Sequence, residues 1–182
     1  MPRKNALALI LACCLSASPV AGKEHRLNLH PQWEFVADTV MGGVSAGEIS
    51  DVTLDGREAT RLAGEVSLDN NGGFIQMAFD LQNDDQTFDA SGWAGIEIDV
   101  LGNGEEYEIR LRTDQLSRPW QSYRTAFIAA KVWTTIRLPF SDFTPNKTDV
   151  PFDPKRLRRI GILAYGREYQ ADVAVSAIRL YR

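Results

Sequence analysis

Tyr107-Glu108-Ile109-Arg110-Leu111-Arg112-Thr113-Asp114 is a run in which every second side chain is charged and the residues between are not. A period of two places the two kinds of side chain on opposite faces of an extended strand. A period of two, with mostly apolar side chains at every second position, recurs in several further runs, at residues 75–81, 96–100, 123–127, 132–138, 160–164 and 173–175. Each run is predicted to be a half-buried β-strand.

Turn signals separate these strands, and most contain glycine or asparagine, as at residues 55–56, 71–73 and 102–104. Strands that recur roughly every ten to fifteen residues, with no long helical segment between them, favour a sandwich or barrel over strand–helix units. The predicted fold class is therefore all-β, a β-sandwich. One short helix is expected, because Asp153 can cap it and Pro154 can take its first position. Residues 155–159 would form its solvated basic face.

The chain has 182 residues, of which 44% are hydrophobic and 24% charged, a composition typical of a globular protein. No repeat or linker divides residues 23–182, so they are interpreted as one domain. The net charge of −4 gives no electrostatic reason to expect a nucleic-acid partner. From Lys23 onward, no apolar run approaches the length that spans a bilayer.

Residues 1–22 have the three-part order of a secretory signal peptide. Arg3 and Lys4 form a basic start, residues 6–15 are apolar, and small residues follow up to a cleavage site before Lys23. The sequence therefore predicts export, with the domain located in the periplasm. The alternative is that this segment is a buried strand or helix of the fold.

Both cysteines, Cys13 and Cys14, fall inside the signal segment, so the processed chain would contain none. No disulfide would then stabilise the domain in an oxidising compartment. A second interpretation is a lipoprotein, because residues 10–12 before Cys13 loosely resemble a lipobox. Lipidation at Cys13 would bring the domain into contact with a membrane.

The sequence has little of the chemistry that catalysis or metal binding needs. His25 and His30 are its two histidines, and neither belongs to a cluster of metal ligands. No motif places a Ser or Cys nucleophile beside a base. We therefore expect no enzyme activity, no cofactor and no metal site. Two alternatives stay open: a glycosidase built from a pair of turn carboxylates, and a structural Ca²⁺ held near Asp84 and Asp85.

Two segments are too unusual to be generic turns, namely residues 33–45, WEFVADTVMGGVS, and residues 64–74, GEVSLDNNGGF. Within them, residues 41–43 and 71–73 are bends where the backbone can take positive φ and approach another group closely. Asn70 and Asn71 add side-chain donors and acceptors beside the second bend. Taken alone, each segment can be interpreted as a tight turn that closes an edge of the sandwich.

Together these segments resemble the complex I intermediate-associated protein 30 family, whose pattern is a Trp, then D-x-V-M-G-G-x-S, then G-x-V-S-L-[DE]-N-N-G-G-F. Similar stretches continue at residues 102–111, 133–143 and 160–162, so the resemblance covers nearly all of the processed chain. It implies a jelly-roll sandwich of the galactose-binding-like type that binds incompletely assembled proteins while membrane complexes are built. It implies no catalytic residues. The candidate binding residues in the two motifs are Asp38, Met41, Gly42, Gly43, Asn70, Asn71, Gly72 and Gly73.

A second candidate surface follows from the charged face of the strand at 107–114. Trp120 and Tyr123 come shortly after Arg110 and Arg112. If the strands that carry them are neighbours, these four side chains share one sheet face, a composition typical of interface hot spots and of sugar-binding surfaces. Trp120 is expected to be exposed. The other tryptophans are expected in the core, namely Trp33, Trp93 and Trp133.

Two functions are therefore compatible with the sequence. The first is a non-catalytic binding protein of the cell envelope that binds protein partners, such as a membrane complex or its intermediates. The alternative is a carbohydrate-binding module that recognises a glycan through the exposed aromatic surface. A hydrolase is a third hypothesis, and it would require a functional pair of carboxylates.

Overall fold

The computed structural model describes residues 25–83 and 86–182. Three features discussed above lie outside the described residues: the proposed signal peptide at 1–22, the lipidation alternative at Cys13, and the acidic pair Asp84-Asp85.

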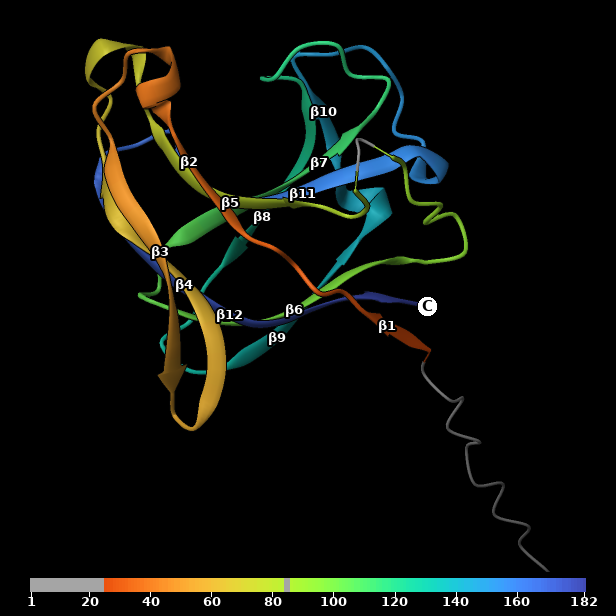
Figure 1. Cartoon of the computed structure of the whole chain (residues 1–182), viewed down its shortest axis with the longest axis horizontal. Coiled ribbons are helices and arrows are strands. Elements are labelled where there is room, and N and C mark those ends of the chain that lie inside the picture. The colour runs from red at the N-terminus through yellow and green to blue at the C-terminus, as the bar shows by residue number, and fades with distance from the viewer. Residues whose placement is uncertain (1–24, 84–85) are drawn as a thin grey trace, which may run out of the picture.

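The described residues form two antiparallel sheets that pack face to face (Figure 1). Sheet I has the strand order β3-β4-β12-β6-β9, and sheet II has the order β10-β8-β7-β11-β5-β2. The strands of sheet I are β3 (Ala46–Leu54), β4 (Arg57–Val66), β12 (Tyr169–Tyr181), β6 (Gly95–Gly102) and β9 (Thr134–Pro139), with β1 (Arg26–Asn28) paired to the last residues of β12. Those of sheet II are β10 (Thr144–Asn146), β8 (Ser122–Ile128), β7 (Glu106–Thr113), β11 (Leu157–Tyr165), β5 (Phe74–Asp80) and β2 (Glu34–Ala37).

The core between the sheets is made of the uncharged members of the alternating runs. Ile98 in β6 and Ile109 in β7 have no exposed surface, and Leu111 and Ile162 are equally enclosed. Full burial of one such side chain is worth roughly 1.5–3 kcal/mol relative to leaving it in water. The charged residues that alternate with them point away from the core. The all-β sandwich predicted from the sequence is confirmed.

Helical structure in the described residues is limited to four single 3₁₀ turns, η1 (Asp38–Met41), η2 (Asp69–Asn71), η3 (Phe140–Asp142) and η4 (Pro154–Arg156). None of these helices has the length or apolar character needed to span a membrane. The predicted cap at the start of η4 is present, since the Asp153 carboxylate accepts a hydrogen bond from the Lys155 backbone N–H at 3.0 Å.

The predicted helix does not continue to residue 159. Leu157 already belongs to β11 and is fully buried, and Arg159 pairs with β5 on one side and β7 on the other. Because β11 is a central strand, its pairing on both edges outweighs the weak local preference of this segment for helix. The basic residues after Arg156 therefore stand on a sheet rather than on a helix.

The tryptophan predictions hold in part. Trp33 and Trp93 are partly buried and pack against the core, and the Trp33 ring lies edge-on to Phe79 at 4.8 Å. Trp133 is different, because its indole N–H donates to the Leu54 carbonyl at 3.2 Å and the Arg57 guanidinium lies over its ring. Trp133 therefore covers the turn of the β3–β4 hairpin and does not join the core.

On the outer face of sheet I, the carboxylate of Glu97 joins neighbouring strands although only 1% of the residue is exposed. Arg137 of β9 donates to it at 2.8 Å, and Arg26 of β1 lies 2.9 Å away as an ion pair. Burial alone would raise the pKa of Glu97, but the hydrogen bonds from Arg137 and Arg26 outweigh it and hold that pKa below its ordinary value. These contacts fix β1, and with it the start of the described chain, to sheet I.

Candidate binding site

The two unusual motifs of the sequence are the connections that carry the chain between the sheets at one end of the sandwich. The segment with η1 leads from β2 in sheet II to β3 in sheet I, and the segment with η2 leads from β4 in sheet I back to β5 in sheet II. Figure 1 shows both crossovers side by side at this end, the first in orange and the second in yellow.

The Asp38 carboxylate joins the two crossovers, although it has no exposed surface. Its Oδ1 accepts a hydrogen bond from the Ser45 backbone N–H at 3.0 Å. Its Oδ2 accepts from the backbone N–H groups of Gly73 at 2.6 Å and Phe74 at 3.2 Å, and from the Ser45 hydroxyl. The Ser45 oxygen in turn accepts from the Ser67 N–H at 3.0 Å. One side chain thus satisfies donors that lie up to 36 positions further along the chain.

Two glycines are required where the crossovers meet this carboxylate. A Cβ on Gly43 would lie 2.4 Å from the Asp38 carboxyl carbon, and one on Gly72 would lie 2.6 Å from its Oδ2. Both distances are far below van der Waals contact, and the atom approached is held in place by its hydrogen bonds. The backbone can therefore close around Asp38 only where it carries no side chain.

The motifs contain the predicted left-handed positions at Gly42 (φ 89°), Asn71 (φ 59°) and Gly73 (φ 128°), and Asn70 beside the second bend is left-handed as well (φ 55°). Asn70 and Asn71 are exposed, as is Gly42. The expected place of Asp38 in a binding surface is corrected, because the side chain is wholly enclosed by the crossovers.

Burial by itself would raise the pKa of Asp38, but the hydrogen bonds from Ser45, Gly73 and Phe74 outweigh that effect. The pKa is therefore held below its ordinary value, and the side chain is an anion at neutral pH. Asp38 therefore has a structural role inside the crossovers, and only their exposed residues can contact a partner.

The crossovers expose large apolar side chains beside polar residues such as Asp69, Asn70 and Asn71. Large side chains that a soluble domain normally buries are exposed here, by 71% for Val40, 58% for Met41, 49% for Val44 and 48% for Leu68. We name these four residues the crossover tip. Apolar side chains gathered on an exposed surface are characteristic of protein interaction sites. The sequence motifs identified Met41 but gave no sign that Val40, Val44 and Leu68 are also exposed.

The second candidate surface is a groove of about 270 Å³ on the outer face of sheet II, which we name the arginine groove. It brings together Arg110, Arg112 and Trp120, as predicted, with Trp120 49% exposed at its edge. Its other members were not predicted from the sequence, and they are Gln76, Ala78, Pro119, Ser122, Arg158, Arg159 and Gly161. Arg158 and Arg159 were missed because they were assigned to a helix.

Tyr123 does not belong to this groove. In the pairing of β7 with β8, Tyr123 is opposite Leu111, so both side chains point into the core. Tyr123 is fully buried, and its hydroxyl donates to the Pro151 carbonyl at 3.1 Å. The neighbouring Ser122 takes the outward position instead, because successive side chains of a strand alternate between faces.

Carboxylates neutralise part of the groove. Arg110 donates to Glu108 at 2.7 Å, and Arg159 is paired with Glu34 at 2.7 Å and Asp80 at 3.1 Å. Arg112 instead donates to a backbone carbonyl, that of Arg118, at 3.1 Å.

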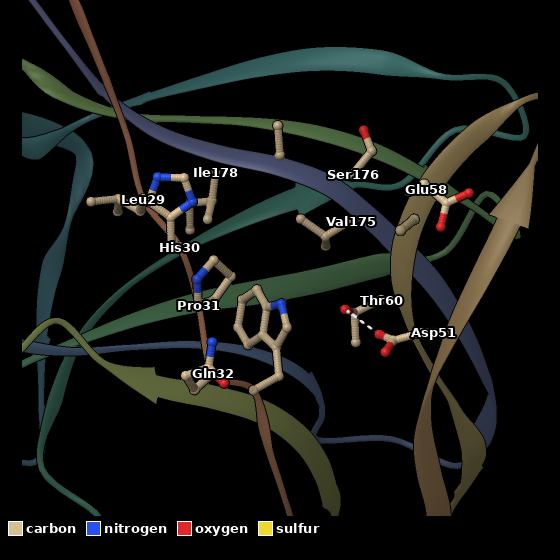
Figure 2. A pocket seen from close by; sticks show the side chains of 13 residues that line it. Leu29, His30, Pro31, Gln32, Asp51, Glu58, Thr60, Val175, Ser176 and Ile178 are labelled. Atoms are coloured by element: carbon tan, nitrogen blue, oxygen red, sulfur yellow. Dashed lines mark hydrogen bonds between the residues drawn. The ribbon is translucent and has the colours of Figure 1, made fainter.

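A larger hollow of about 460 Å³ lies along one edge of β12, between the part of this strand that pairs with β4 and the part that pairs with β1 (Figure 2). Figure 2 shows His30 on one side of the hollow and Asp51, bonded to Thr60, on the other. Asp51 and Glu58 are exposed, and these polar groups do not converge. Nor does any group of three or more His, Cys, Asp and Glu side chains among the described residues have the arrangement to hold a metal ion. We therefore regard the crossover tip and the arginine groove as the candidate sites.

Comparison with known proteins adds a family and a fold. The sequence profile of the family described as complex I intermediate-associated protein 30 matches residues 23–174. No curated protein sequence matches the chain significantly.

Among solved structures, a family 11 carbohydrate-binding module from Clostridium thermocellum, in complex with a β-1,3-1,4-mixed-linked tetrasaccharide, is similar with a TM-score of 0.68 and 16% identity. The match covers 85% of this chain and 94% of that one. A family 30 carbohydrate-binding module of a Clostridium thermocellum cellulosomal cellulase has a TM-score of 0.63 and 17% identity, over 86% of this chain and 96% of that one. At these identities the likeness is one of fold, and it confirms the predicted jelly-roll sandwich of galactose-binding-like type.

The contacts of Asp38 generate a prediction about stability. Asp38→Asn should lower the free energy of unfolding at pH 7 by about 3 kcal/mol, because buried N–H donors would then face an amide that cannot accept from all of them. Since the folded pKa is depressed, the stabilisation is present above the ordinary value of 3.8 and is lost as the pH falls through the folded pKa.

Urea unfolding at pH 7 and at about pH 3 measures both effects, with Asp69→Asn, in the exposed turn beside Asp38, as the matched control. We expect a large difference between wild type and Asp38→Asn at pH 7, a smaller one in acid, and little change in the control. Equal stability of Asp38→Asn and wild type at pH 7 would contradict the role assigned to this carboxylate.

Proposed function

The chain belongs to the complex I intermediate-associated protein 30 family, and from this premise we propose that it is a non-catalytic binding protein that holds incompletely assembled protein partners at the crossover tip. The observation that carries the proposal is the exposure of Val40, Met41, Val44 and Leu68 on crossovers that a buried carboxylate holds together.

A partner that has not yet been assembled exposes apolar surface that its final neighbours will later cover. The crossover tip offers a complementary surface, on which Met41 adds a flexible and polarizable side chain suited to partners of varied shape. Because Asp38 fixes the backbone beneath, binding does not have to order these loops, and the entropic cost of association is lower. The family's description, which names association with intermediates of complex I, agrees with this use of the surface.

We assign the protein no catalytic reaction. The carboxylates that contact Arg110 and Arg159 of the arginine groove are all engaged in ion pairs, namely Glu108, Asp80 and Glu34. None of the three is placed as the free acid or base that glycoside hydrolysis requires.

The proposed location is the periplasm, with residues 1–22 acting as a signal peptide; a lipoprotein anchored through Cys13 is the alternative. This proposal rests on the order of basic, apolar and small residues at the start of the sequence. In either case the partners would be proteins of the cell envelope.

Variants that place a charge on the crossover tip test the protein-binding proposal. Met41→Asp combined with Leu68→Asp should reduce the recovery of specific partner proteins from solubilised envelope membranes by about tenfold, because each carboxylate would lose its hydration in an apolar interface. Both side chains are exposed, so the variant should fold normally. Val132→Asp is the matched control, since Val132 is 65% exposed at a distant turn. Recovery of the same partners by wild type, tip variant and control alike would count against this function.

A second candidate function is glycan recognition in the arginine groove. The exposed Trp120 beside Gln76, Ser122 and the arginines favours it, because sugars combine apolar ring faces with hydroxyl groups that need polar partners. The similar structures, carbohydrate-binding modules by their descriptions, add support only at the level of fold.

A glycan screen tests this second function. Trp120→Ala should weaken binding to any recognised glycan by about tenfold, since it removes the aromatic face against which the apolar C–H face of a sugar ring would pack, and a tenfold loss corresponds to about 1.4 kcal/mol. Ile128→Ala, at a residue that is 61% exposed on the same sheet, is the control. If no glycan binds, or if binding is indifferent to Trp120→Ala, the groove is not a glycan site.

A further inference from the structure

The guanidinium group of Arg112 has different hydrogen-bond acceptors from those of Arg61 and Arg156. Arg61 and Arg156 each present Nε and Nη2 side by side to one carboxylate, at 2.7 Å to Asp172 and 2.6 Å to Asp114. Such two-point pairing is the preferred arrangement of a guanidinium with a carboxylate. Arg112 lacks it: Nη2 donates to a carbonyl, and the buried Nε has no acceptor among the described residues.

Arg112 also has no ion pair with a carboxylate among the described residues, although Asp80 offsets part of its charge from a distance. Arg110 and Arg159 beside it in the groove have carboxylate partners, while the nearby Asp114 is taken by Arg156. Burial, and then the charges of Arg158 and Arg159, lower the pKa of Arg112. An unpaired, partly buried cation next to other cations is costly, and an anion in the groove would relieve that cost.

The rest of the groove has room for a single ring. Gly161 and Ala78 are paired across β11 and β5 and leave the floor without large side chains. The volume of about 270 Å³ corresponds to about nine water molecules, which suits one sugar ring rather than a folded segment of protein. Trp120 lies at the edge of the groove, on a turn that two hydrogen bonds stabilise. The Arg118 carbonyl accepts one from the Gln121 backbone N–H and the other from the Arg112 guanidinium.

We propose that the arginine groove binds an acidic sugar, a hexuronate unit whose carboxylate pairs with Arg112 while its ring lies against Trp120. The ligand class is a singly charged carboxylate because Arg110 and Arg159 already have carboxylate partners, which leaves the guanidinium of Arg112 as the group that a ligand carboxylate would pair with. This inference rests on the second candidate function, glycan recognition, and it is independent of the crossover tip.

The test is calorimetric titration of the purified domain with oligogalacturonate and oligomannuronate, and with the methyl ester of each. Esterification keeps the ring and removes the charge, so at least one acid should bind about tenfold or more tightly than its ester. Arg112→Gln should weaken binding of the acid by about tenfold and leave the ester unchanged. Arg57→Gln, on the distant β3–β4 hairpin, should change neither.

The outcomes separate the inference from the function beneath it. An ester that binds as tightly as its acid overturns the acidic specificity and leaves glycan recognition standing. Failure of both acids and both esters to bind overturns the inference, and a negative glycan screen would then remove the glycan function as well. Inorganic phosphate that displaces the acid at equal concentration would show a site for free oxyanions and overturn the sugar assignment. If Arg112→Gln does not fold, Trp120→Ala with the acid and ester pair decides in its place.

Discussion

The buried carboxylate of Asp38 is the contact on which the end of the sandwich depends. It receives backbone N–H groups from two crossovers that connect the same two sheets in opposite directions. Without an acceptor at this point, several buried donors would be unsatisfied, each at a cost of about 1–3 kcal/mol. The two glycines that face Asp38 follow from the same constraint, because a side chain at either would occupy the space of the carboxylate.

That constraint connects stability to function. Loops that carry exposed apolar side chains tend to collapse onto themselves or onto the core, but a backbone fixed from within keeps Val40, Met41 and Leu68 in solvent. The groove on sheet II is held in a different way, by an ion pair that ties Arg159 of β11 to Asp80 of β5 and by a second pair, Arg110 with Glu108, within β7. One rigid framework therefore presents an apolar surface and a charged groove, and each suits a different class of partner.

The strands and the sandwich could be predicted from the sequence because a period of two is a local property. The burial of Asp38 could not, because its partners Gly73 and Phe74 are 35 and 36 positions away. Tyr123 was misplaced because it was grouped with Trp120 by nearness in the sequence, although its alternation with Phe127 already placed it on the apolar face of its strand. Arg158 and Arg159 were assigned to a helix because their pairing on both edges of β11 is visible only in the assembled sheet.

The central claim, that partners are held at the crossover tip, is tested most directly by site-specific photocrosslinking in intact cell envelopes. A photoreactive residue at position 41 should give a discrete adduct with a protein that is not yet part of its mature complex. The same residue at position 132 should give none. Adducts that form from position 132 but not from position 41 would contradict the account.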